Sequence, residues 1–144
     1  MKLLILNGPN LNMLGIREPE IYGTETYETL CRKVLDYAAA HGVEAELYQS
    51  NHEGDLVDKL QAAYGNTDGI VINAGAYTHT SIALYDALKA VDIPAVEVHI
   101  SDPDAREPFR RVSYLRAACF AAISGHGTDG YLEAMALLIG NGAK

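Results

Sequence analysis

The sequence has 144 residues, of which 49% are hydrophobic and 21% are charged, and its formal net charge is −8. This size and composition fit one globular domain and exclude an intrinsically disordered chain. The acidic balance argues against a nucleic-acid-binding protein, because such proteins carry a basic surface that neutralises phosphates.

The chain opens on an apolar run at residues 3–6, which predicts a strand. The polar stretch LNGPNLNMLGIREPEIYG comes next and lacks the glycine spacing of a phosphate-binding loop. Its second half, about residues 15–24, is expected to form a lid loop that carries Arg17 and Tyr22. A guanidinium beside a phenol favours the phenolate, so Tyr22 is a candidate base. The alternative is a surface loop whose tyrosine packs against a neighbour.

Two amphipathic stretches flank the next apolar run, at residues 45–48, which predicts the second strand. Residues 26–41 place apolar side chains on one face at helical spacing and predict a helix. Residues 53–64 predict another helix, before which Ser50 and Glu53 resemble a capping box.

The run at residues 69–73 predicts a third strand without polar alternation, as expected when helices cover both faces of a sheet. The stretch NAGAYTHTS ends this strand, and Thr78 or Thr80 is expected to cap a helix at residues 80–91. His79 would then lie at the start of that helix and face a crevice. The alternative is ordinary helix capping with a solvated histidine.

The run at residues 94–100 predicts a fourth strand, which carries Glu97 and His99. Residues two apart on a strand point to the same face, so the carboxylate can orient the imidazole and support its cationic form. A histidine held in this way at a strand end is a candidate general acid or base. The alternative is a structural histidine–glutamate pair at the edge of the sheet.

The stretch AREPFRR, residues 105–111, carries Arg106 and Arg110 four residues apart, which places them on one face if the segment is helical. These arginines contact a ligand only if the segment folds over the strand ends, and otherwise they belong to a solvated turn. Residues 118–123 predict the fifth strand, and residues 129–139 predict the last helix.

The alternation of strands and helices predicts an α/β fold, a flavodoxin-like doubly wound sheet of five parallel strands in three αβα layers. We expect a single catalytic domain over residues 1–144. In such a fold, ligands bind beyond the carboxyl ends of the strands, near the point where the strand order reverses. The polar residues that follow each strand are therefore the candidate site.

The two cysteines, Cys31 and Cys119, lie among apolar residues, which favours buried, reduced thiols and a cytoplasmic protein. The apolar run at the N-terminus is too short for a signal peptide or a membrane span. His79 and His99 have no third ligand at a recognisable spacing, so no metal site is expected.

Six segments spread over nearly the whole chain carry a family resemblance: ILNGPNLNMLGIREPEIYG, YQSNHEGDLVD, NAGAYTHTSIAL, VEVHIS, AREPFRRVSY and GHGTDGY. Together they closely resemble type II 3-dehydroquinate dehydratase, also called type II dehydroquinase. The resemblance implies a flavodoxin-like fold, no metal and no organic cofactor. It implies dehydration of 3-dehydroquinate to 3-dehydroshikimate, in the shikimate pathway or in quinate catabolism. It also implies a homo-dodecamer, built as a tetramer of trimers, with no nucleic-acid or membrane partner.

The resemblance implies a role for each catalytic residue. Tyr22 would be the base that removes a C2 proton, and Arg17 would keep Tyr22 ionised and support the developing enolate. Asn10 would help to position a water molecule at the enolate oxygen. His99 would be the general acid that protonates the departing C1 hydroxyl, oriented by Glu97.

The resemblance also implies substrate-binding residues. Ile100 and Ser101 would hold the substrate carboxylate, chiefly through backbone N–H groups and the serine hydroxyl. Asp86 would reach the site from a neighbouring subunit, and Arg106 would add positive potential near the tyrosine. Three further side chains would contact polar groups of the substrate: Asn73, His79 and Arg110.

The sequence departs from the family pattern at three places, none of which removes a proposed catalytic group. Ala74 stands where proline is common, and Tyr85 stands where a basic residue is common. Residues 102–104, DPD, stand where Asn-x-His or Asn-x-Tyr is common. The two aspartates add negative charge near the expected carboxylate pocket, and Tyr85 puts the contact made by Asp86 in question.

Two rival interpretations remain open. One is a non-catalytic flavodoxin-like binding module, which would use the same crevice but would not need both Tyr22 and His99. The other is a related lyase that acts on a different hydroxylated cyclic acid. The matched segments contain no lysine, which disfavours a Schiff-base route.

Overall fold

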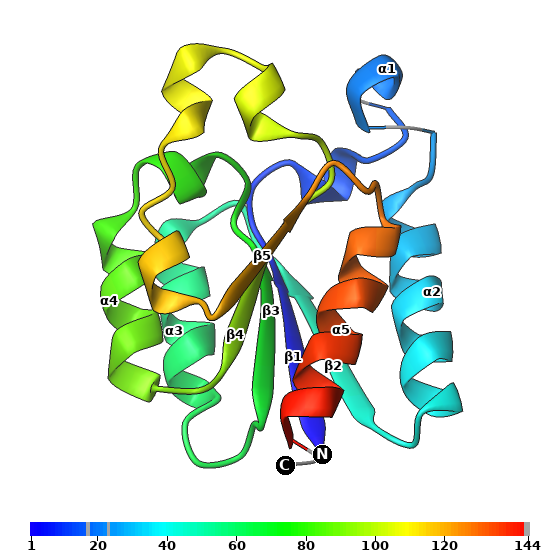
Figure 1. Ribbon diagram of the computed structural model, residues 1–144, viewed down its shortest axis with the longest axis vertical. Helices are drawn as coiled ribbons and strands as arrows, with labels where there is room; N and C mark the ends of the chain where they lie inside the picture. Colours follow the sequence, from blue (N-terminus) through cyan, green and yellow to red (C-terminus); the bar gives the residue numbers. More distant parts are fainter. Residues whose placement is uncertain (17, 23, 143–144) are drawn as a thin grey trace.

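A parallel sheet of five strands, in the spatial order β2-β1-β3-β4-β5, runs through the middle of the molecule (Figure 1). The computed structural model describes residues 1–16, 18–22 and 24–142, without the side chain of Tyr22. The strands are β1 (Lys2–Asn7), β2 (Glu44–Gln49), β3 (Gly69–Asn73), β4 (Ala95–His99) and β5 (Ala121–Ser124). The strand order confirms the predicted flavodoxin-like fold and reverses between β1 and β3.

Helices cover both faces of this sheet (Figure 1). One face carries α2 (Tyr27–Ala40) and α5 (Asp129–Gly142), and the other carries α3 (Glu53–Ala62) and α4 (Ile82–Val91). A short helix, α1 (Pro19–Tyr22), lies at the carboxyl end of the sheet (Figure 1). The described residues also form five 3-10 turns: η1 (Leu11–Met13), η2 (Gly75–His79), η3 (Pro103–Ala105), η4 (Pro108–Arg111) and η5 (Arg116–Ala118).

The apolar run of β1 divides its side chains between two cores. Leu3 and Ile5 belong to the core under α2 and α5, whereas Leu4 and Leu6 belong to the core under α3 and α4. All four are essentially fully buried, and burial of each such side chain stabilises the fold by about 1.5–3 kcal/mol. Burial on both faces explains why this strand shows no polar alternation in the sequence. Within residues 1–16, 18–22 and 24–142, no helix is both long and apolar enough to cross a membrane.

Two predicted helix caps are wrong. His52, and not Ser50, is the N-cap of α3, and the Ser50 hydroxyl instead accepts from the His52 N–H and donates to the Asp55 carboxylate. Ser81 caps α4 by accepting from the Leu84 N–H at 3.0 Å, in place of either threonine of the preceding segment. In both cases a short turn between strand and helix moves the cap by one to three residues, which periodicity alone does not reveal.

The turns that follow β1 and β3 approach each other closely. The Gly8 N–H donates to the Asn73 carbonyl at 2.8 Å, and a Cβ on Gly8 would overlap the carbonyl of Ala74. Gly75 has φ +59°, and a Cβ there would lie 2.9 Å from the Pro9 carbonyl oxygen. These contacts between backbone atoms require glycine and bring the ends of the two strands together.

We predict that Gly8→Ala lowers the free energy of unfolding by about 2 kcal/mol or more, because the backbone of Ala74 must shift to admit the methyl group. Gly54→Ala is the control, since a Cβ at this position of α3 meets no atom within 4 Å. That change should raise stability by about 0.5 kcal/mol through helix propensity. Urea unfolding measures both, and a Gly8→Ala variant as stable as the unchanged protein would contradict the overlap.

Candidate active site

A cavity of about 200 Å³ opens at the carboxyl ends of β1, β3 and β4, where the strand order reverses. Its lining includes Asn10 from the turn after β1 and residues from η2, from the end of β4 and from the segment that carries η3 and η4. Figure 1 shows this segment (yellow) above the strand ends. The structure therefore brings together these predicted site residues: Asn10, Asn73, His79, His99, Ile100, Ser101, Arg106 and Arg110.

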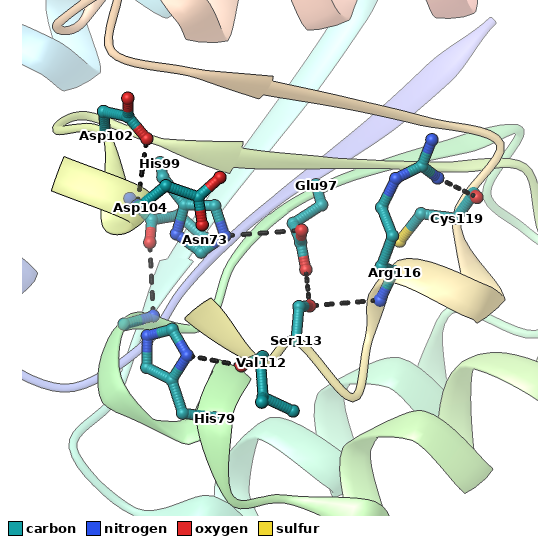
Figure 2. Close-up of polar contacts among 11 residues, drawn as sticks. Asn73, His79, Glu97, His99, Asp102, Asp104, Val112, Ser113, Arg116 and Cys119 are labelled. Atoms are coloured by element: carbon teal, nitrogen blue, oxygen red, sulfur yellow. Dashed lines mark hydrogen bonds and ion pairs between the residues drawn. The ribbon is translucent and has the colours of Figure 1, made fainter. Parts of the chain in front are cut away.

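Glu97 and His99 form an ion pair beside the cavity. They lie two residues apart on β4, and the Glu97 Oε2 atom is 3.4 Å from His99 Nε2 (Figure 2). Both residues are buried, with Glu97 only 3% exposed. Because β4 lies inside the sheet, the alternative of a pair at the sheet edge is wrong. With Nε2 facing the carboxylate, Nδ1 is the ring nitrogen left to face a ligand.

A second contact completes the surroundings of the Glu97 carboxylate. The Ser113 hydroxyl donates to Glu97 Oε1 at 2.5 Å (Figure 2). Burial alone would raise the pKa of Glu97, but the hydrogen bonds from His99 and Ser113, with the positive charges of His99 and Arg116, hold it below its ordinary value. Glu97 therefore stays ionised beside His99.

His79 is held in one orientation by the backbone. Its Nδ1 atom lies 2.6 Å from the Val112 carbonyl oxygen (Figure 2), so Nδ1 carries a proton and donates it. The His79 and His99 rings stack nearly parallel, with centroids 6.3 Å apart. The predicted position of His79, facing a crevice near the start of α4, is confirmed.

Asn73 has structural partners as well as a place in the cavity wall. Its Nδ2 atom donates to the Tyr131 hydroxyl at 2.9 Å, and its Oδ1 atom accepts from the Gly75 N–H at 3.2 Å. The Tyr131 hydroxyl in turn donates to Asn7 Oδ1 at 2.6 Å. Burial raises the pKa of Tyr131 above its ordinary value, so the phenol stays neutral and donates.

Asn10 has an unusual backbone conformation, with φ 70° in the left-handed region. Its N–H donates to Asn51 Oδ1 at 3.0 Å, and Gln49 Nε2 donates to the same oxygen at 3.2 Å. Asparagine tolerates this conformation better than most residues, but the conformation still has an energetic cost. Gln49 at the end of β2 and Asn51 after it therefore fix the position of Asn10 at the cavity.

The condition under which Arg106 and Arg110 would share one face, a helical segment, is not met, because η3 ends before Arg106 and η4 begins after it. Both arginines nevertheless line the cavity. Glu107 lies between them, with its Oε2 atom 2.6 Å from Arg110 Nε and 3.9 Å from Arg106 Nε. Arg106 also lies 4.0 Å from Glu18, which precedes α1. Proline at the start of each turn interrupts the helical spacing that the sequence suggested.

Ile100 and Ser101 continue β4 into the cavity wall. Their carbonyls accept hydrogen bonds from Gly127 and Gly125, at 3.0 and 3.2 Å. Both glycines have positive φ angles, which lets this loop turn tightly against the end of β4. Residues 100 and 101 are thereby fixed with their backbone along the cavity.

The predicted site residue Asp86 is not brought to this cavity by its own chain. Asp86 is exposed on α4 and does not belong to the cavity lining. Arg17 lies outside the described residues, as does the side chain of Tyr22. Among the residues that the structure describes, no cluster of three or more histidine, cysteine, aspartate or glutamate side chains is placed to hold a metal ion.

The sequence interpretation missed three residues that support the site: Asn51, Ser113 and Tyr131. Ser113 lies in an irregular segment between η4 and η5, where no periodicity indicates which way a side chain points. Tyr131 lies on α5, where the sequence pattern indicates only an ordinary core residue. Only Asn51, inside a polar segment that follows a strand, carried a signal that could have identified it.

Comparisons with known proteins agree on one family. The family model described as dehydroquinase class II matches residues 1–139. The 3-dehydroquinate dehydratase of Clostridium acetobutylicum is 54% identical over 138 residues, which is 96% of each chain. That of Corynebacterium glutamicum is 55% identical, over 95% of this chain and 94% of the relative. The crystal structure of type II dehydroquinase from Butyrivibrio crossotus superimposes with a TM-score of 0.95 at 52% identity, covering 96% of this chain and 97% of that one.

We predict that Glu97→Gln lowers the free energy of unfolding by about 1–3 kcal/mol at neutral pH, since the ionic partner of His99 is lost. Ionised Glu97 stabilises the fold above its unfolded pKa of about 4.3, and this contribution is lost as the pH falls through its lower folded value. The unchanged protein should therefore lose stability more steeply than the variant below a pH of about 4. Urea unfolding across this range, with Glu44→Gln as an exposed control, makes the comparison. Parallel curves for all three proteins would argue against the pair.

Proposed function

Since the chain belongs to the class II dehydroquinase family, we propose that this cavity is the site in which it dehydrates 3-dehydroquinate to 3-dehydroshikimate. The chain is a hydro-lyase of the shikimate pathway and uses the cofactor-independent chemistry of this class. One observation carries the assignment of the site: a buried histidine–carboxylate pair faces a cavity that two arginines also line.

The reaction needs a base for a carbon acid. The C2 proton lies next to the ketone and is weakly acidic, so the base must be stronger than a neutral phenol and the enolate must be stabilised. Tyr22 and Arg17 meet this need as a tyrosinate beside a guanidinium, and their assignment rests on the match of IREPEIYG to the family pattern. In the proposal, Tyr22 takes the C2 proton and the electron pair moves into the enolate. The lid, about residues 15–24, closes over the substrate to bring this pair to C2.

The second half of the reaction needs an acid. Hydroxide is a poor leaving group, so His99 gives its proton to the C1 hydroxyl as the C1–O bond breaks and water departs. The Nδ1 atom is the donor, because Nε2 faces Glu97. The electron pair of the enolate then forms the C1–C2 double bond and restores the ketone. The ionised Glu97 stabilises the cationic imidazole before this proton transfer.

Positive charge and backbone N–H donors favour binding of the substrate carboxylate in this cavity. Arg106 and Arg110 lie at the cavity wall, and both are close to the Glu107 carboxylate. We assign the carboxylate to Ile100 and Ser101, with Asn73 and His79 at the substrate hydroxyls and Asn10 at a water beside the enolate oxygen. Asp102 accepts from the Asp104 N–H at 3.0 Å, which occupies part of its acceptor capacity within the turn (Figure 2).

A cytoplasmic location belongs to the same proposal. Cys31 and Cys119 are both free thiols in the structure, but only Cys119 is buried, so the predicted burial is wrong for Cys31, which is partly exposed. Burial is the main cause that raises the pKa of the Cys119 thiol, to about 12, so this group is unreactive at neutral pH. Free, unreactive thiols suit a reducing compartment.

Turnover of 3-dehydroquinate tests the proposed function directly. The conjugated enone product absorbs in the ultraviolet, and the purified protein should produce it without added metal or cofactor. Tyr22→Phe should retain the fold and lose about a hundredfold or more of the turnover rate, because the base is removed. Tyr64→Phe, at a tyrosine that is 71% exposed, is the matched control. A Tyr22→Phe variant with full activity would remove Tyr22 from its role, and an inactive unchanged protein would contradict the function.

The proposed assembly is a homo-dodecamer in which Asp86 reaches the cavity of a neighbouring subunit. This arrangement explains why an exposed residue of α4, remote from the cavity of its own chain, matches a binding residue of the family. Light scattering should give the mass of twelve chains. A monomer would leave Asp86 without its role.

We predict that Asp86→Asn lowers kcat/KM about tenfold or more, as expected for loss of a charged hydrogen-bond partner. Asp58→Asn, at an exposed position of α3, is the control. Co-expression of Asp86→Asn with His99→Gln should restore part of the activity, since mixed assemblies contain sites with both original residues. Absence of such complementation would place any effect of Asp86 within its own chain.

A further inference from the structure

We infer that Ser113 is a positioning residue, which holds the Glu97 carboxylate so that one oxygen is directed at His99. The inference rests on the proposed function of His99 as the general acid, and it adds Ser113 to the residues that support this acid. Ser113 does not belong to the cavity lining and donates to Glu97, so we place its effect on His99 through Glu97.

The direction of the Ser113 proton follows from its contacts. The hydroxyl oxygen accepts from the Arg116 N–H at 3.1 Å, so its single proton is directed at Glu97 Oε1 (Figure 2). A serine hydroxyl has one proton and two lone pairs, and the backbone donor occupies one of these lone pairs. The orientation of the hydroxyl is therefore fixed by the turn that begins η5.

The two oxygens of Glu97 then have different partners. Oε1 accepts from Ser113, and Oε2 lies 3.4 Å from His99 Nε2. Because Glu97 is buried within the sheet, water does not replace a missing donor freely, and an unpaired carboxylate oxygen there is costly. Loss of the serine hydroxyl would favour rotation or protonation of the carboxylate, and either change weakens its support of the imidazolium.

Other charged groups face this pair from the neighbouring elements. His79 of η2 stacks against His99, and Arg106 and Arg110 face the cavity side. Arg116 attracts the negative charge of Glu97. The Cys119 thiol stays neutral, because burial and the negative charge of Glu97 raise its pKa. These groups set the electrostatic surroundings of Glu97, whereas Ser113 also fixes the orientation of its carboxylate.

The expected effect on Glu97 has a definite sign. The hydrogen bond from Ser113 is one of the causes that hold the pKa of Glu97 below its ordinary value against the opposing effect of burial. In Ser113→Ala the pKa of Glu97 rises, so Glu97 accepts a proton at a higher pH. Activity that needs ionised Glu97 is then lost earlier as the pH falls.

A serine elsewhere in the chain provides a matched control. The Ser50 hydroxyl accepts from the His52 N–H at 3.0 Å and donates to Asp55 Oδ2 at 2.9 Å, which is the same pair of bonds outside the site. Ser50→Ala removes an equivalent structural tie without touching Glu97. Comparison with Ser50→Ala separates a general loss of stability from an effect on His99, the proposed general acid.

The experiment compares Ser113→Ala, Ser113→Thr and Ser50→Ala with the unchanged protein. NMR follows the titration of isotope-labelled glutamate carboxyl carbons, with the Glu97 signal assigned by its loss in Glu97→Gln. Steady-state kinetics with 3-dehydroquinate give kcat and KM across the same pH range. If Ser113→Ala fails to fold, Ser113→Cys retains the side-chain size with a weaker donor and carries the test.

In Ser113→Ala we expect the Glu97 titration to move up by about one pH unit. We expect kcat to fall about tenfold and KM to change little. The acid limb of the rate profile should move in the same direction as the Glu97 titration. Ser113→Thr should restore both, and Ser50→Ala should move neither. An unmoved Glu97 titration in Ser113→Ala, or an equal shift in Ser50→Ala, would overturn the inference. If the titration moves but no variant and no unchanged protein turns over 3-dehydroquinate, the proposed function fails and the positioning of Glu97 stands.

Discussion

The hydroxyl of Tyr131 joins the ends of the two central strands, and much of the site depends on it. It donates to Asn7 at the end of β1 and accepts from Asn73 at the end of β3. Both asparagines are buried, so each needs a polar partner inside the protein. Because Asn73 is fixed in this way, its Oδ1 atom receives the Gly75 N–H and sets the start of the turn that carries His79. A tyrosine of the last helix thus organises turns that come much earlier in the chain.

Glu97 illustrates how the sheet supports chemistry. A carboxylate on an internal strand is unfavourable unless it is paired, and here each oxygen has its own partner. The same low exposure that makes the group costly also keeps water away and strengthens its influence on His99. The segment after η4 contacts this carboxylate through Ser113. The same contacts therefore serve the packing of Glu97, its ionisation and the proposed acid function of His99.

The sequence predicted the strands, the long helices and the crevice, because apolar periodicity and strand-end polarity are local signals. It placed β5 too early, since residues 116–118 form η5 and the strand begins at Ala121. It left open whether the segment of Arg106 and Arg110 is helical, and the structure has two turns there, each with a proline at its start. Ser113 escaped notice because its direction depends on contacts between segments that are distant from each other in the sequence. The roles of Arg17 and Tyr22 stay predictions, because Arg17 and the side chain of Tyr22 lie outside the described residues.

Asn10 combines two demands that a single residue seldom meets. Its backbone occupies the left-handed region at φ 70°, which glycine adopts at lower cost, while the residue lines the cavity, where the proposed function needs its amide. A selection for thermal stability alone would favour glycine here, and a selection for turnover would retain the amide. The trade-off between robustness and activity is thereby concentrated at one position, and stability engineering of this fold has to exempt it.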